Sequence, residues 1–140
     1  LQGLYKLLEQ TKQKFNTTPT HSIDELIKLS KLFPNNIVIY ISTLNNKVVG
    51  GSVIFHTTKT TSLVFYNIVS EKMKESQLSS LQLYQSIKAC KQRGSKIFDL
   101  GVSQTPEKTN PLDPKFSLIQ FKEQFGAQGV LRIAYEKEYK

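Results

Sequence analysis

Apolar positions at helical spacing open the chain. The apolar residues within 4–15 are separated by polar ones and predict a first helix. Ser22 precedes Glu25 by three positions, which is the pattern of a capping box, so we expect a second helix over about residues 22–32. Two amphipathic helices therefore come before any strand.

Three segments rich in strand-forming residues follow. The β-branched run 37–41 predicts a strand that is buried on both faces. Turn-forming residues at 44–47 separate it from a second strand over 48–55, so an antiparallel hairpin is expected. The second strand contains Gly50-Gly51, and paired glycines within a strand indicate a bulge or a close backbone approach. A third strand over 62–69 would complete a meander.

Helices and strands alternate in the rest of the chain. A helix over 77–93 is expected to end at Gly94, the residue type that commonly follows a helix. A short strand at 97–100 then follows a helical crossover and should pair in parallel with a meander strand. A helix over 116–125 and a final strand over 129–135 complete the order. The order predicts a mixed α/β fold with a mostly antiparallel sheet and helices on both faces.

Composition bounds the class of protein. The 140 residues are 39% hydrophobic and 21% charged, as in ordinary globular domains, and no apolar run is long enough for a membrane span. We expect one domain, residues 1–140, and because the chain begins at Leu1 without Met we expect a fragment of a longer protein. Cys90 is the single cysteine, so no internal disulfide can form and the cytoplasm is the expected compartment. Its helical spacing places it on an apolar face, as a packed rather than a reactive thiol.

Neither the net charge nor the placement of the histidines identifies a partner. The net charge of +8 favours anionic partners such as nucleic acid, an anionic lipid surface or a phosphate-bearing small molecule, and it does not choose among them. The lysines are scattered, so a solvated basic surface explains them as well. His21 and His56 lie in different predicted elements without a cysteine or carboxylate at ligand spacing, so we expect no metal site.

Six segments carry a family resemblance. They are PTHSIDEL at 19–26, LFPNNIVIYIS at 32–42, VVGGSVIF at 48–55, FYNIVSE at 65–71, FDLGVS at 98–103 and LIQFKEQFGAQG at 118–129. In this order they resemble acyltransferase domains of the GNAT fold, and in particular the C-terminal domain of the FemABX and BioF-type-two group. Two such domains often lie in tandem in FemABX relatives, so the resemblance implies a tandem GNAT domain or a second copy as partner.

The resemblance also implies a reaction. Such enzymes transfer an acetyl, acyl or aminoacyl group from acyl-CoA or aminoacyl-tRNA to an amine of a small molecule or a cell-wall precursor, by direct attack. In GNAT enzymes the donor lies where the strand here at 62–69 splays from the strand here at 97–100. The pyrophosphate of coenzyme A lies at the N-terminus of the helix that follows the first of these strands. The residues implied to bind the cofactor are Asn67, Val69, Ser70, Ser76 and Ser79. The family's usual glycine-containing coenzyme A loop is absent at 72–80, so acetyl-CoA, another acyl-CoA and aminoacyl-tRNA all stay open as donors.

The same resemblance suggests catalytic and substrate-binding residues. Lys122 resembles the helix lysine that faces the substrate cavity in FemABX-type proteins and would stabilise developing negative charge. Glu123 is a candidate base and Tyr66 a candidate general acid, while Ser103 and His21 are candidates for binding the acceptor. Each also has a structural explanation, namely a solvent-facing helix residue, a packed tyrosine, a turn serine and a histidine that precedes a helix. The alternative functions are a catalytically inert half of a tandem protein that binds a substrate or a partner, and nucleic-acid binding without catalysis.

Overall fold

The computed structural model describes residues 1–104, 113–131 and 135–138, and the chain divides into two compact units. The first unit, Leu1–Gly101, contains α1 (Gln2–Gln13), α2 (Ile23–Leu32), β1 (Ile37–Leu44), β2 (Lys47–His56), β3 (Thr61–Val69), the 3-10 helix η1 (Glu71–Met73), α3 (Leu78–Gln92) and β4 (Ile97–Asp99). The second unit, Val102–Lys140, contains α4 (Phe116–Glu123).

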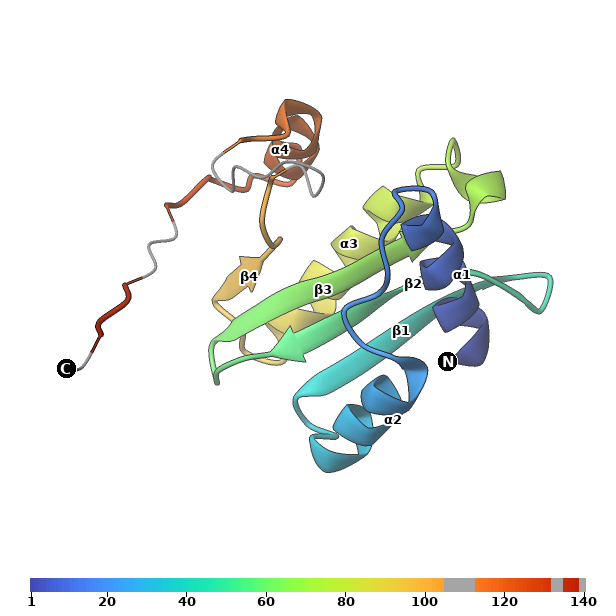
Figure 1. The fold of residues 1–140 in the computed structure, drawn as a ribbon, viewed down its shortest axis with the longest axis horizontal. Coiled ribbons are helices and arrows are strands. Elements are labelled where there is room, and N and C mark those ends of the chain that lie inside the picture. The colour runs from blue at the N-terminus through green and yellow to red at the C-terminus, as the bar shows by residue number, and fades with distance from the viewer. Residues whose placement is uncertain (105–112, 132–134, 139–140) are drawn as a thin grey trace. The chain divides into compact units, whose positions relative to one another are not determined.

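The four strands of the first unit form one sheet in the order β1-β2-β3-β4. β2 is antiparallel to both β1 and β3, whereas β4 is parallel to β3. Helices α1 and α2 lie on one face of the sheet, and α3 lies on the other (Figure 1). This confirms the predicted fold class, a mixed and mostly antiparallel sheet with helices on both faces.

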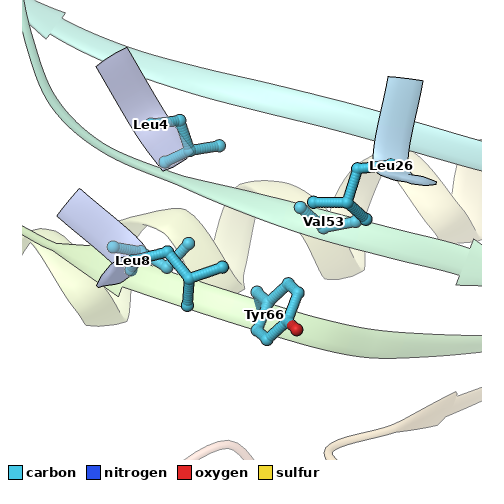
Figure 2. Close-up of a cluster of buried hydrophobic side chains, with 6 residues drawn as sticks. Leu4, Leu8, Leu26, Val53 and Tyr66 are labelled. Atoms are coloured by element: carbon cyan, nitrogen blue, oxygen red, sulfur yellow. The ribbon is translucent and has the colours of Figure 1, made fainter. Parts of the chain in front are cut away.

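The hydrophobic core of the first unit lies on the face that α1 and α2 cover. Leu4 and Leu8 of α1 and Leu26 of α2 are buried against Val53 and Tyr66 of the sheet (Figure 2). Burying a side chain of this size stabilises the fold by about 1.5–3 kcal/mol. The core therefore holds both helices, and the loop between them, against β2 and β3.

Local sequence signals form the predicted caps and turns. The Ser22 side chain accepts a hydrogen bond from the Glu25 N–H, and the Glu25 carboxylate accepts one from the Ser22 N–H, so the capping box of α2 is present. Asn45 and Asn46 both have positive φ, at 48° and 61°, and they form the two-residue connection that joins β1 to β2. Asparagine tolerates this conformation better than most residues do, so the predicted hairpin is confirmed.

The glycine pair in β2 marks a close approach, as predicted. A Cβ at Gly51 would lie 2.3 Å from the carbonyl oxygen of Tyr40 and 2.9 Å from Leu4 Cδ1. At Gly50 it would lie 2.4 Å from Gln82 Nε2. The absence of a side chain at Gly51 thus lets β1 and α1 pack closely against β2.

Two sequence-based expectations about strands are wrong. The run 37–41 is not buried on both faces, because β1 is an edge strand in which Tyr40 and Ile41 are 39% and 43% exposed. β-branched residues favour strands of either kind, so their presence did not reveal how deeply the strand is buried. Residues 129–131 form no strand, and 132–134 lie outside the described residues. An apolar run becomes a strand only where a neighbour pairs its backbone groups.

Buried polar side chains line the face that α3 covers. His56 Nδ1 lies 2.7 Å from Ser62 Oγ, which in turn lies 2.6 Å from Ser95 Oγ. Burial lowers the pKa of His56, and the nearby charge of Arg93 acts in the same direction. Burial raises the pKa of the Cys90 thiol, which is 1% exposed, so this cysteine is held as a packed thiol.

We expect Gly51→Ala to lower the free energy of unfolding by about 1–3 kcal/mol, because the new methyl group overlaps β1 backbone and α1. Urea denaturation measures the change. The matched control is Gly129→Ala, whose Cβ would meet nothing within 4 Å. Equal stabilities for the two variants would contradict the close approach.

The lowered pKa of His56 predicts a pH dependence of stability. The folded state favours the neutral ring, so its contribution is complete above about pH 6.5 and is lost as the pH falls from there toward the folded value. The difference in unfolding free energy between the wild type and His56→Gln should therefore shrink between about pH 7 and about pH 5. Denaturant titrations at several pH values measure it, and a constant difference would show that the ring does not titrate abnormally.

Candidate functional site

Strand β3 loses its parallel neighbour early. The pairing of β3 with β4 covers Thr61↔Ile97, Ser62↔Phe98 and Leu63↔Asp99, although β3 continues to Val69. The pairing ends where the Asp99 carboxylate accepts a hydrogen bond from the Gly101 N–H at 2.7 Å. Gly101 has φ +74°, a conformation that glycine adopts without strain. The local turn of FDLG therefore ends β4 and opens the edge of β3.

The second half of β3 directs some of its backbone groups away from β2. The Ser70 N–H donates to the Val49 carbonyl at 2.8 Å, toward β2. Successive residues of a strand direct their backbone groups to opposite edges, so Asn67 and Val69 direct theirs away from β2. In the described part of the chain, no strand is paired with β3 on that side beyond Leu63. An extended ligand with amide groups could add to the edge as a strand does.

A bulge accompanies the opening. Val53 pairs with Tyr66 and Ile54 pairs with Val64, which leaves Phe65 as an extra residue in β3. Such a bulge increases the local twist and redirects the side chains that follow it. The strand therefore changes direction just beyond Leu63, its last residue paired with β4.

The N-terminus of α3 follows the open edge. Its N-cap residue, Gln77, has φ +57° and makes no side-chain capping hydrogen bond. The first N–H groups of such a helix have no intrahelical partner, and the helix dipole adds positive potential there. The Asn67 amide donates to the carbonyl and the hydroxyl of Ser79 at 3.2 and 2.9 Å, and it accepts from Ser52 at 2.8 Å. These contacts fix the first turn of α3 to β3.

A surface pocket of about 360 Å³ lies beside the end of β3. The pocket is lined by Val69, Ser70 and Glu71, by residues of α1 and by Lys14, which follows α1. Glu71 bonds both Lys14 and Lys74, and these hydrogen bonds hold the pKa of its carboxyl below the usual range. Two lysines thus surround one carboxylate just after the end of β3.

Two candidate residues lie on the face covered by α1 and α2. Tyr66 is 7% exposed, and its hydroxyl accepts a hydrogen bond from the Thr20 N–H at 3.0 Å (Figure 2 shows the residue in the core). The ring of His21 packs against Phe65, with 5.1 Å between ring centroids. Tyr66 thus fixes the loop that carries His21 to the strand whose edge is open.

The other candidates lie elsewhere. The Ser76 hydroxyl donates to the Met73 carbonyl at 2.6 Å on the exposed surface. In the second unit, Lys122 Nζ donates to the Val102 carbonyl at 2.7 Å and to Ser103 Oγ at 2.9 Å. Glu123 is exposed at the end of α4. The structure therefore brings together Lys122 with Ser103, Asn67 with Ser79, and Tyr66 with the loop of His21.

Two features of the site have no signal in the sequence. Phe65 is an ordinary strand residue by type, and only the register with β2 shows it to be the bulge. Gln77 adopts a conformation that favours glycine or asparagine, so nothing in its type marks it as an N-cap. Within the described residues no group of three or more His, Cys, Asp or Glu side chains could hold a metal ion. None of the helices in that part of the chain has the length and hydropathy required to cross a bilayer.

We expect Tyr66→Phe to lower the free energy of unfolding by about 1–3 kcal/mol, because the Thr20 N–H would lose its acceptor while it stays partly buried. Thermal or urea unfolding measures the change. Tyr5→Phe removes the neighbouring bond to the His21 carbonyl and is the matched comparison. An unchanged stability for Tyr66→Phe would show that its hydroxyl does not hold the loop.

No protein-family model and no curated protein matches the chain, whereas many solved structures do. An acetyltransferase from Trypanosoma brucei matches with a TM-score of 0.68 at 14% identity, over 99% of this chain and 92% of its own. An aminoglycoside acetyltransferase from an uncultured soil metagenomic sample, in complex with sisomicin, gives 0.66 at 14% identity, over 97% and 87%. A GNAT family acetyltransferase from Elizabethkingia anophelis with acetyl-CoA bound gives 0.52 at 16% identity, over 70% and 58%.

At such identities the likeness concerns the fold. These solved structures share the arrangement of sheet and helices that the first unit shows, and each of them is an acetyltransferase. Membership of the FemABX group stays a prediction. The chain has the fold of the GNAT acetyltransferases.

Proposed function

We propose that this protein is an N-acyltransferase that takes an acyl group from acyl-CoA and transfers it to the amine of a small molecule. The observation that carries the proposal is the edge of β3 beyond Leu63, where no described strand pairs with it, together with the N-terminus of α3, which has no side-chain cap. Solved structures of the same fold support it, since one holds acetyl-CoA and another holds the aminoglycoside sisomicin.

The open edge suits the chemistry of coenzyme A. The pantetheine arm carries amides, which the backbone groups of Asn67 and Val69 could bind as a strand neighbour would. Its pyrophosphate suits the N–H groups in the first turn of α3, which have no intrahelical partner. Ser76 and Ser79 lie at this end of the helix, and Ser70 lies between β3 and η1. The donor supplies an activated carbonyl carbon, and these residues hold and orient it.

The glycine-containing coenzyme A loop that is usual in the GNAT family is absent here, and a different local structure connects β3 to α3. η1 and the left-handed N-cap Gln77 connect β3 to α3 without a glycine. Lys14 and Lys74 both pair with Glu71 just after β3, and a phosphate could replace the Glu71 carboxylate as their partner. A phosphate site built from a helix N-terminus and lysines needs no glycine-containing loop.

Lys122 and Ser103 lie together within the second unit. We propose that Lys122 and Ser103, which are hydrogen bonded to each other, contact the acceptor or the developing negative charge as a pair. Glu123 remains a candidate base. The acceptor would be a primary amine of a small molecule or a cell-wall precursor, and the cytoplasm is the proposed compartment.

An aminoacyl-tRNA donor is the second candidate. The net charge of +8 favours it, as does the absence of the usual coenzyme A loop. A catalytically inert half that needs a tandem GNAT domain or a second copy is the third. Donor binding separates them, because only the first candidate requires that coenzyme A itself bind this chain.

We expect acetyl-CoA and coenzyme A to stabilise the protein by about 2.7 kcal/mol at about a hundredfold excess over the dissociation constant. Thermal unfolding with and without each ligand measures the effect. Ser80→Asp should remove it without lowering the stability of the free protein, since a carboxylate in the first turn of α3 favours the helix dipole and repels phosphate.

Ser80→Asn is the matched control and should keep the ligand effect, because it adds no charge. No stabilisation of the wild type at millimolar ligand would contradict an acyl-CoA donor. Unfolding with aminoacyl-tRNA would then separate the second candidate from the inert half.

A further inference from the structure

The loop before α2 is fixed to two other elements. The Thr20 N–H donates to the hydroxyl of Tyr66 on β3 at 3.0 Å. The hydroxyl of Tyr5 on α1 donates to the carbonyl of His21 at 3.1 Å. The backbone of His21 is thus held from both sides, so its ring has a defined place.

The ring of His21 lies among aromatic side chains. Its centroid is 5.1 Å from that of Phe65 and 6.2 Å from that of Phe55, and the two phenylalanine rings stack on each other at 4.7 Å. Nδ1 of His21 is buried and has no hydrogen-bond partner among the described residues. An unpaired buried nitrogen costs stability, of the order of 1–3 kcal/mol, so a purely structural histidine is poorly suited to this position.

The His21 ring packs against the part of β3 that lies just beyond its pairing with β4. Phe65 is the bulge residue of β3, and Leu63, two positions earlier, is the last residue paired with β4. His21 therefore packs against β3 at the point where its edge opens. A donor that binds along Asn67 and Val69 with its pyrophosphate at the start of α3 extends along β3 toward Phe65.

We propose that His21 is the proton acceptor for the attacking amine, acting through Nε2 while Nδ1 stays enclosed by the aromatic rings. The inference rests on the proposed function. The amine nitrogen forms a bond to the thioester carbon as the carbon–sulfur bond breaks, the proton of that nitrogen passes to Nε2, and the leaving thiolate takes a proton back. No external oxidant or metal is required.

Neighbouring titratable groups are less suited to this role. The Glu25 carboxylate accepts the Ser22 N–H at 2.7 Å, and this bond lowers its pKa, which weakens it as a base. Burial raises the pKa of Tyr5, so its hydroxyl keeps its proton at neutral pH. Tyr66 uses its oxygen to accept the Thr20 N–H. Histidine is also the side chain that enzymes use most often as a general base.

The other histidine of the chain provides a matched control. His56 lies on the opposite face of the sheet, where Nδ1 is 2.7 Å from Ser62 Oγ. It is 6% exposed, and its partner Ser62 lies in the part of β3 that is paired with β4, before the open edge begins. His21→Gln and His56→Gln therefore remove the same group from two faces of one sheet.

The experiment compares the wild type and both variants in three measurements. Thermal unfolding with coenzyme A reports donor binding, and kcat/KM with acetyl-CoA and a panel of primary amines is followed from about pH 5.5 to about pH 9. The ¹⁵N shifts of the His21 imidazole are recorded with and without coenzyme A and an amine. This third measurement does not require turnover.

We expect His21→Gln to bind coenzyme A within about twofold of the wild type while kcat/KM falls by about 10²–10⁴ and the rise of the rate with pH near neutrality disappears. His56→Gln should keep that rise. A His21→Gln enzyme that keeps the pH profile and loses less than about threefold would overturn the proposal.

The same measurements separate failure of this proposal from failure of the proposed function. If the wild type binds coenzyme A but transfers to no amine in the panel, the imidazole shifts decide. A change in the His21 shifts on adding amine, with none for His56, supports the proposal. Unchanged His21 shifts would overturn it. Absence of coenzyme A binding would instead contradict the acyl-CoA function on which it rests.

Discussion

Among the described residues, β3 has a neighbour on both edges along its first three residues, Thr61 to Leu63, because β4 ends at Asp99. The Asp99 carboxylate accepts a hydrogen bond from the Gly101 N–H, and Gly101 adopts a left-handed conformation. A continuous parallel pair would satisfy every backbone group of β3 and leave no room for a donor. The donor edge, the approach to α3 and the place of the bulge all depend on this early end.

The hydrophobic core on the face covered by α1 and α2 positions His21, the other part of the proposed site. Gly51 admits α1 close to the sheet, and the buried leucines hold both helices there (Figure 2). Tyr66 belongs to that core and also bonds the loop that carries His21. The packing that stabilises the first unit therefore places a titratable ring beside the bulge at Phe65. Loss of the hydrogen bond between Tyr66 and the loop would therefore change where the His21 ring lies.

Features encoded over a few residues were predictable, and those that depend on register were not. The capping box at Ser22, the hairpin at Asn45-Asn46 and the close approach at Gly51 follow from residue type and spacing, and the structure contains all three. The bulge at Phe65 exists only relative to β2, so no spacing in the sequence reveals it. Of the strand predicted over 129–135, the described residues 129–131 and 135 form none, because an apolar pattern becomes a strand only where a neighbouring strand pairs its backbone groups.

The central claim is that the backbone of β3 beyond Leu63 binds the acyl donor. Amide hydrogen exchange of Asn67 and Val69, followed with and without acetyl-CoA, tests it most directly. The account predicts that these two amides exchange more slowly when acetyl-CoA is present, while the amide of Ser70, already bonded to Val49, changes little. Unchanged exchange at Asn67 and Val69, in a protein that acetyl-CoA nevertheless stabilises, would place the donor elsewhere and contradict the account.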